Sequence, residues 1–334
     1  MSFKDIFGHK EELKLLQDNL RNKKLSSAYL FLGPEQIGKK LVALNFAKAL
    51  NCLETSGGPC DKCPPCKKID ANNFPDIFVL EPMMAGSTIG IDKIRQIKKD
   101  ASLKPYEGRY KVFIIDRACA MSHESQNAIL KILEEPGDNN LFILITSSLH
   151  RILPTVSSRC RIVRFKAGPR GKLEEYLITR GRIKKEEALL IAAFSGGRIG
   201  EAIDLEDSDF FNKKNAVIKR MLESLRKPVS KDMFREWALL ERPLLRKDME
   251  VVLSWFRDIY IWKITKNSAL FFNMDISKNI IKSADNFSLS ELENIMKRII
   301  TLDFHLTCNA NQKLVTDVFL SELGRLRGEE VCMK

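Results

Sequence analysis

Short apolar runs alternate with helical patterns through the first half of the chain. Runs rich in Val, Ile, Leu and Phe, each bounded by polar or turn residues, predict strands at residues 28–32, 77–80, 112–115, 141–146 and 161–165. The segments between them show helical spacing, as in residues 39–50. Strands that are apolar throughout are typical of a parallel sheet covered on both faces. The pattern therefore predicts an α/β fold with a five-stranded parallel sheet and flanking helices.

The pattern changes after residue 165, where strand-like runs become scarce. Residues 167–171 (Ala-Gly-Pro-Arg-Gly) indicate a linker. Three short helices are predicted next, at residues 173–179, 186–194 and 198–205. Longer amphipathic patterns follow at residues 235–245, 249–265, 290–306 and 311–327. We therefore expect three domains: an α/β domain at 1–166, a small three-helix domain at 167–207 and an all-α domain at 208–334.

Composition narrows the class of protein. A length of 334 residues is enough for several domains, each with its own core. The formal net charge of +12 suits a polyanionic partner such as DNA, but basic residues also cover ordinary solvated helices. No stretch approaches the roughly 18 apolar residues of a membrane span, and the N-terminus does not resemble a secretory signal. We therefore expect a cytoplasmic protein that has no membrane partner.

Residues 33–40 (Gly-Pro-Glu-Gln-Ile-Gly-Lys-Lys) fit a nucleotide-binding P-loop between a predicted strand and a predicted helix. Gly33 and Gly38 allow backbone amides to surround phosphates, and Lys39 can reach them. Lys40, however, stands where a serine or threonine would bind Mg²⁺. The phosphate-binding part of the motif is present, and the metal-binding hydroxyl is missing.

A second departure follows the third predicted strand. Asp116 occupies the position of a Walker B aspartate, but Arg117 stands where a second acid is usual. Two cationic replacements at one metal site predict that hydrolysis is lost. Binding of ATP without turnover stays open.

Four cysteines cluster after the P-loop helix: Cys52, Cys60, Cys63 and Cys66. Two residues separate successive members of the last three, and residues 57–59 provide a turn before them. Four thiolates at this spacing can complete a tetrahedral site, so we predict a structural zinc module at residues 52–66. The alternative is four reduced thiols that pack as small apolar groups. The remaining cysteines lack such spacing and are predicted to be ordinary thiols: Cys119, Cys160, Cys308 and Cys332.

Several segments together resemble a known family. They are residues 3–9 (FKDIFGH), 27–34 (SAYLFLGP), 127–136 (NAILKILEEP), the tripeptide Ser158-Arg159-Cys160 and the four-cysteine insertion. These are similar to the AAA+ clamp loaders of bacterial replication, and specifically to the delta prime subunits of DNA polymerase III. The resemblance covers nearly the whole chain. It implies an AAA+ module, a small helical lid, and a C-terminal helical collar that includes the region 309–323.

The resemblance also implies roles for particular residues. Arg159 would be an arginine finger that enters the ATP site of a neighbouring subunit, with Ser158 and Cys160 in its motif. A guanidinium suits this role because it stays charged and offers forked donors to phosphate oxygens. An intramolecular ion pair is the alternative for such an arginine.

Two further positions can be compared with the motor subunits of the family. Gly200 stands where these subunits have a sensor-two arginine, and Arg198 is near but out of register. Thr146 or Ser147 would fill the sensor-one region, where a structural polar contact is an equal alternative.

The implied role is a nonhydrolysing subunit of the DNA polymerase III holoenzyme. The implied partners are motor (gamma/tau-like) and delta-like subunits in a heteropentamer, with the sliding clamp and primed DNA reached through the complex. Two alternatives stay open. One is an ATP-hydrolysing motor in which Asp116 and Glu124 or Glu134 compensate for the replacements. The other is a zinc-dependent DNA-binding protein that uses three lysines beside the metal: Lys62, Lys67 and Lys68.

Overall fold

The computed structural model describes residues 3–54, 57–84, 87–226, 237, 239–307 and 310–325. The chain divides into two compact units, residues 1–176 with 195–203 and residues 177–194 with 204–334. Parts of the predicted helices at 235–245 and 311–327, the start of the region 309–323, and Cys308 and Cys332 lie outside the described residues.

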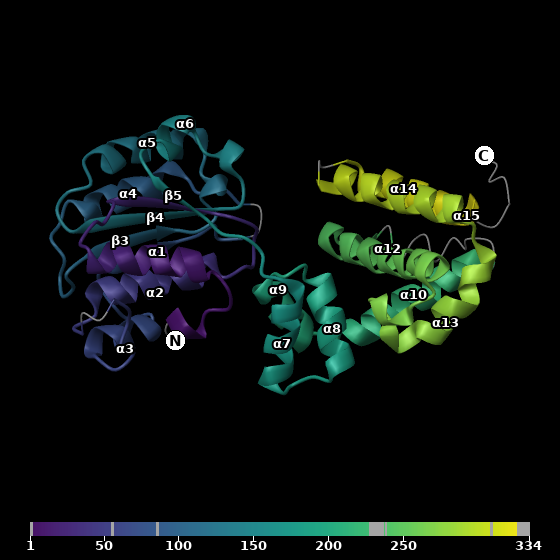
Figure 1. The fold of residues 1–334 in the computed structure, drawn as a ribbon. Coiled ribbons are helices and arrows are strands. Elements are labelled where there is room, and N and C mark those ends of the chain that lie inside the picture. Colours follow the sequence, from purple (N-terminus) through teal and green to yellow (C-terminus); the bar gives the residue numbers. More distant parts are fainter. Residues whose placement is uncertain are drawn as a thin grey trace. The chain divides into compact units, whose positions relative to one another are not determined.

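A five-stranded parallel sheet forms the centre of the first unit (Figure 1). Its strands are β1 (Ala28–Leu32), β2 (Ile77–Leu80), β3 (Lys111–Ile115), β4 (Asn140–Thr146) and β5 (Arg161–Arg164), in the spatial order β2-β3-β4-β1-β5. The five predicted strands are confirmed, with ends that differ by at most one residue. On the inner strand β1, Tyr29 and Phe31 belong to one core and Ala28 and Leu30 to the other. Alternate side chains are therefore buried on opposite faces of the sheet.

Helices cover both faces of this sheet, as Figure 1 shows. One face is covered by α1 (Lys10–Arg21) and α2 (Lys39–Asn51), and α3 (Pro64–Asp70) lies against α2. The other face is covered by α4 (Ile91–Ala101), α5 (His123–Glu134) and α6 (Pro154–Ser157). Apolar residues three and four positions apart produce this burial, for example Ile129, Ile132 and Leu133 on α5. The predicted α/β architecture is confirmed.

Three short helices follow the sheet: α7 (Arg170–Arg180), α8 (Lys185–Phe194) and α9 (Ile199–Asp207). They correspond to the three predicted helices. The predicted linker is shorter than expected, because α7 begins at Arg170 within residues 167–171. The limits between the two compact units fall inside α7, at the end of α8 and inside α9.

The second unit is helical over its described residues. Its main helices are α10 (Phe210–Arg226), α12 (Arg242–Thr265), α13 (Ser277–Ser283), α14 (Leu289–Thr307) and α15 (Gln312–Arg325). Short 3-10 helices occur across both units at Phe3–Asp5, Ala118–Ala120, Leu149–Arg151, Ser268–Leu270, Met274–Ile276 and Ala284–Asn286. Helix α12 packs against α10, α13 and α14. Among the described residues, no helix combines the length and the apolar character that crossing a membrane would require.

One prediction about α12 is wrong. The sequence analysis gave residues 235–245 and 249–265 as two separate helical patterns, but one helix begins at Arg242, inside the first pattern, and continues through residues 246–248 to Thr265. Leu245 and Met249 are both buried and lie one turn apart, so the core contact is uninterrupted. Of the three polar residues between them, Arg246 pairs with Asp303 of α14 at 2.6 Å. The charged residues 246–248 therefore interrupt the apolar pattern in the sequence without interrupting the helix.

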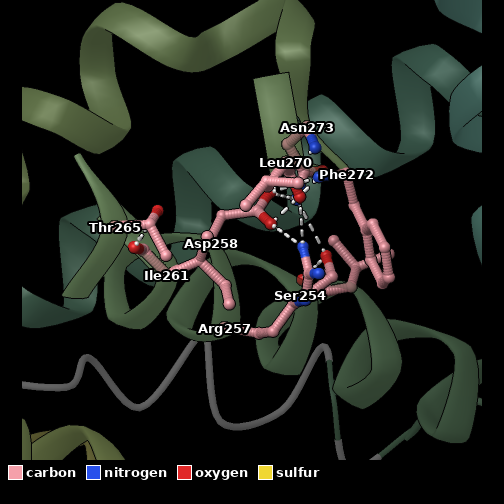
Figure 2. A network of polar contacts seen from close by, with 9 residues as sticks. Ser254, Arg257, Asp258, Ile261, Thr265, Leu270, Phe272 and Asn273 are labelled. Carbon is pink, nitrogen blue, oxygen red and sulfur yellow. Dashed lines mark hydrogen bonds and ion pairs between the residues drawn. The ribbon is translucent and has the colours of Figure 1, made fainter. Parts of the chain in front are cut away.

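A buried carboxylate anchors the segment that follows α12 (Figure 2). Asp258 is fully buried and accepts hydrogen bonds from the backbone N–H groups of Phe272 and Asn273, at 3.0 and 2.8 Å. The Asn273 side chain and the Arg257 guanidinium also donate to it, at 2.8 and 2.7 Å. Arg257 lies over the Phe272 ring and donates to the Leu270 carbonyl. The charge of Asp258 is therefore paired and hydrogen-bonded, as a buried charge requires.

Candidate functional site

The predicted P-loop joins β1 to α2. Gly33 approaches the residue after β5 so closely that a Cβ atom here would lie 2.3 Å from the Phe165 carbonyl oxygen. Gly38 precedes α2 with a φ of 98°, a conformation that favours glycine. The strand–turn–helix geometry predicted for this motif is present, with the N-terminus of α2 at the carboxyl edge of the sheet.

Lys39 is turned into its own loop. Its Nζ donates hydrogen bonds to the carbonyl oxygens of Gly33, at 2.6 Å, and Pro34. The residue is buried, and this burial lowers the pKa of Lys39, although Glu35 and Asp116 oppose the shift. For this ammonium to contact a phosphate, it would have to give up its contacts with the loop carbonyls.

The start of α9 lies against the same loop. The backbone N–H of Gly200 donates to the Gln36 carbonyl at 2.7 Å, and a Cβ atom on Gly200 would lie 2.8 Å from that oxygen. The position compared with a sensor-two arginine is therefore used for a close backbone contact. Arg198 is held locally: its Nε donates to the Ser195 carbonyl at 3.0 Å, and its Nη2 pairs with Glu201.

The two cationic replacements lie at the ends of α2 and β3 that face the loop. Lys40 Nζ donates to Glu81 Oε2 at 2.8 Å, beside a cavity of about 310 Å³ lined by residues of α2, α3 and β2. Asp116 accepts a hydrogen bond from the Arg117 N–H at 2.9 Å, and Arg117 has a left-handed φ of 51°. A lysine and an arginine thus stand at the two positions where the sequence analysis looked for a magnesium-binding hydroxyl and for a second acid that would orient water.

The two positions expected in the sensor-one region differ in their contacts, because Thr146 bonds locally and Ser147 lies against Glu35 of the P-loop. The Thr146 hydroxyl donates to the Ser148 carbonyl at 3.0 Å and accepts from the Ser148 N–H at 3.2 Å. Ser147 Oγ lies 3.4 Å from a carboxylate oxygen of Glu35. The Thr146 hydroxyl therefore bonds to the backbone two residues further on, a contact typical of turns.

The four clustered cysteines converge on one point. Cys52 ends α2, Cys63 precedes α3, Cys66 lies within α3, and Cys60 comes before the turn that leads into it. Their Sγ atoms all lie within 4.8 Å of one another, and those of Cys52 and Cys63 are 3.9 Å apart. Tetrahedral zinc with Zn–S bonds of about 2.3 Å separates sulfur atoms by about 3.8 Å. This cluster can therefore hold a metal ion.

A buried lysine ties the cysteine segment to the P-loop helix. Lys48 of α2 has only 2% of its side chain exposed, and its Nζ pairs with Asp61 and Asp70. Asp61 lies between Cys60 and Cys63 with a φ of 59°, and Asp70 ends α3. One cation thus holds both sides of the cluster. The sequence analysis did not single out Lys48; its signal was a lysine three residues from the end of an otherwise apolar helix face.

Arg159 lies between α6 and β5, and its side chain is bonded within the chain. Its Nη2 pairs with a Glu134 carboxylate oxygen, and its Nη1 donates to the Thr155 carbonyl at 2.8 Å. The side chains of Arg159 and Glu134 are 35% and 47% exposed. Ser158 Oγ donates to the Thr155 carbonyl at 3.1 Å, and burial raises the pKa of Cys160 to about 12.

The structure therefore separates the predicted site residues into three groups. Gly33, Gly38, Lys39 and Asp116 gather at the carboxyl edge of the sheet, the four cysteines form their own cluster, and Arg159 lies at the end of α6. The described contacts of Arg159 go to α5 and α6. Of the lysines near the cysteines, Lys68 pairs with Glu107 at 2.6 Å.

Comparisons with known proteins show which family this chain is similar to. The family model described as "DNA polymerase III, delta subunit" matches residues 8–168. DNA polymerase III subunit delta′ of Bacillus subtilis is 28% identical over 304 residues, which cover 90% of this chain and 91% of that protein. The gamma subunit of Buchnera aphidicola subsp. Schizaphis graminum is 31% identical over 77% of this chain and 71% of that protein. The tau subunit of Bacillus subtilis is 36% identical, but the match spans 37% of its length.

A P-loop between β1 and α2, on a parallel sheet of the order 2-3-4-1-5 with helices on both faces, defines a protein of the AAA+ type. The chain belongs to the clamp-loader subunit family of DNA polymerase III, and a delta′ subunit is among the relatives that it matches over most of its length.

Proposed function

We propose that this chain is a delta prime-like subunit of the clamp loader that does not hydrolyse ATP. The observation that carries this proposal is the P-loop itself. Lys39 is bonded to the carbonyls of its own loop, Lys40 replaces the magnesium-binding hydroxyl and pairs with Glu81, and Arg117 replaces the second acid. Phosphoryl transfer needs a metal ion and an oriented water, and these replacements remove groups that hold both.

The second part of the proposal is that Arg159 acts in trans. Its guanidinium would stabilise the charge that develops on the phosphate oxygens in the ATP site of a neighbouring subunit. Partial exposure at the end of α6, together with the family tripeptide, supports this role. The chain would then be a stator that completes another active site.

The third part concerns assembly. We propose that motor (gamma/tau-like) and delta-like subunits are its partners, and that it meets the sliding clamp and primed DNA through the complex. The names of the relatives support this inference, because each is a subunit of a DNA polymerase III. We also propose that the functional division of the chain is an AAA+ domain at 1–166, a lid at 167–207 and a collar at 208–334.

The metal is proposed to be zinc in a structural role. Four cysteine ligands would fill its coordination sphere, which excludes a water and therefore a catalytic function. The insertion between α2 and α3 contains few apolar side chains, so the metal would supply much of the free energy that orders it.

The decisive experiment is ATP turnover by a complex reconstituted with motor and delta-like subunits, with clamp and primed DNA present. Arg159→Ala should lower turnover at the completed site by on the order of 10³ and leave assembly intact. Arg159→Lys should restore little, because lysine lacks the fork. Arg164→Ala, which removes an exposed arginine from β5, is the matched control. Unchanged turnover in the Arg159→Ala complex would eliminate the trans role.

The same assay on the isolated chain separates the stator from a motor. The tau and gamma relatives favour the motor as the second candidate, with Asp116 and Glu124 or Glu134 supplying the acids. The stator predicts no appreciable turnover with ATP, Mg²⁺ and primed DNA. Turnover that is lost on Lys39→Ala would instead establish the motor.

A further inference from the structure

The guanidinium of Arg159 is already bound to a carboxylate within the chain. Glu134 is the last residue of α5, and its carboxylate pairs with Arg159 Nη2, while the Thr155 carbonyl accepts from Nη1. A negative side chain at a helix C-terminus is unfavourable, because the helix dipole places partial negative charge there. Pairing with Arg159 offsets this repulsion. The pair thus stabilises Glu134 as well as holding the arginine.

A carboxylate and a phosphate offer the same kind of acceptor to a guanidinium, and Arg binds both through its fork. The N–H groups that Glu134 and Thr155 occupy are therefore not available to a phosphate at the same time. Both side chains of the ion pair are partly exposed, so the contact is weak enough for a triphosphate to displace it.

We propose that Glu134 is a positioning residue that holds Arg159 in a withdrawn state and competes with the neighbour's triphosphate for it. This inference rests on the proposed trans role of Arg159. Completion of the neighbouring ATP site then requires the exchange of a carboxylate for a phosphate on one guanidinium. Glu134 tunes the ATP concentration at which that exchange occurs.

The first test is a double-mutant cycle in the reconstituted complex, with the ATP concentration for half-maximal turnover as the readout. Glu134→Gln keeps the size of the side chain and removes its charge. It should lower this concentration about two- to five-fold, equivalent to roughly 0.4 to 1 kcal/mol, the range of exposed ion pairs. In an Arg159→Ala background the same substitution should have no effect. Glu135→Gln removes the adjacent exposed charge and is the matched control.

The second test uses the isolated chain, where no neighbour contributes. The rate at which phenylglyoxal modifies Arg159, followed by mass spectrometry, should rise in Glu134→Gln and stay unchanged in Glu135→Gln. This readout measures release of the arginine and would not move if Glu134 only stabilised the fold.

Separate outcomes overturn the inference and the proposed function. If Arg159→Ala slows turnover but Glu134→Gln leaves the half-maximal concentration unchanged or raises it, the trans role survives and the competition by Glu134 is wrong. An equal effect of Glu135→Gln also overturns it, because the effect would then be general charge repulsion. If Arg159→Ala leaves turnover unchanged, the trans role of Arg159 and the competition by Glu134 are both wrong.

Discussion

At the scale of single residues, Gly200 is important because it has no side chain. The backbone of α9 reaches the P-loop because Gly200 has no Cβ atom, and the Gly200 N–H donates to the Gln36 carbonyl at 2.7 Å. A larger residue at this position would have to move either the helix or the loop. The position where the resemblance leads us to expect a motor subunit's arginine is thus occupied here by a glycine in close contact with the P-loop backbone.

Gly200→Ala is expected to destabilise the first unit by about 1 to 3 kcal/mol, because the added methyl group would lie 2.8 Å from a backbone oxygen. Chemical denaturation would measure the loss. Gly171→Ala is the matched control: nothing lies within 4 Å of its Cβ position on α7, so alanine should be neutral or stabilise by up to about 1 kcal/mol. Equal effects of the two substitutions would contradict the close contact.

At the scale of elements, α2 connects the two features that stand out in the sequence. The helix begins at the P-loop and ends at Cys52, and Lys48 on its last turn holds both sides of the cysteine cluster. The apolar residues of α2 pack against one face of the sheet. The cysteine cluster is therefore attached to a helix that the core holds in place. The ion pairs of Lys48 therefore support the position of the four cysteines, the proposed metal ligands, from outside that set.

Lys48→Met should weaken retention of the proposed zinc, with release to a coloured chelator faster by on the order of 10-fold. The reason is that Asp61, between two ligands, loses its partner. Lys62→Met removes an exposed lysine between the same ligands and is the control. Wild-type protein should contain about one zinc per chain. Equal release rates would show that the lysine does not hold the site, whereas a metal-free wild type would remove the zinc proposal itself.

A second prediction concerns α12 and pH. Burial raises the pKa of Asp248 to about 6, although Arg220 partly offsets this shift. The folded state therefore binds the proton more tightly than the unfolded state, whose ordinary value is 3.8. The stabilising contribution is complete below about pH 4 and is lost as the pH rises through about 6.

Asp248→Asn should therefore change stability little near pH 4 and should stabilise increasingly up to about pH 6, above which the gain levels off. Denaturation midpoints of both proteins between pH 4 and pH 8 would test this. Asp285→Asn, at an exposed position, is the control. A gain that is constant across this range would contradict an effect of the buried charge.

At the scale of the whole molecule, the second unit leaves apolar side chains uncovered. Ile300 and Phe304 on α14 are 57% and 62% exposed, and Leu314 and Val318 on α15 are 62% and 37% exposed. Each pair is spaced by four residues and so lies on one helix face. Exposed apolar groups in such an arrangement support the proposal that this unit joins other subunits.

Phe304→Glu should therefore reduce the fraction of chain that coelutes with motor and delta-like subunits in size-exclusion chromatography. Leu270→Glu, which also places a charge on an exposed leucine of this unit, should not. Wild-type chain should enter a complex of fixed stoichiometry. A loss of assembly that is equal for both substitutions would show that the α14 face has no particular role.

The sequence by itself determined the strands, the α/β architecture, the P-loop and the grouping of the four cysteines. These features are local: apolar runs, glycines and ligand spacings act within a few residues, so they are readable along the chain. The pattern missed the continuity of α12 for the same reason, because a polar helix face and a break look alike without the partner helix.

Only the tertiary structure decided which distant groups meet. Glu134 and Arg159 are 25 residues apart, and Lys48 lies 22 residues from Asp70. Lys39 donates to a carbonyl of its own loop, and the Gly200 N–H, which follows the sheet in the chain, donates to the Gln36 carbonyl. Ion pairs and close backbone contacts leave no periodic trace in a sequence, since each depends on the packing of elements far apart in the chain. These contacts between distant residues were therefore visible only after the elements of the chain were assembled in space.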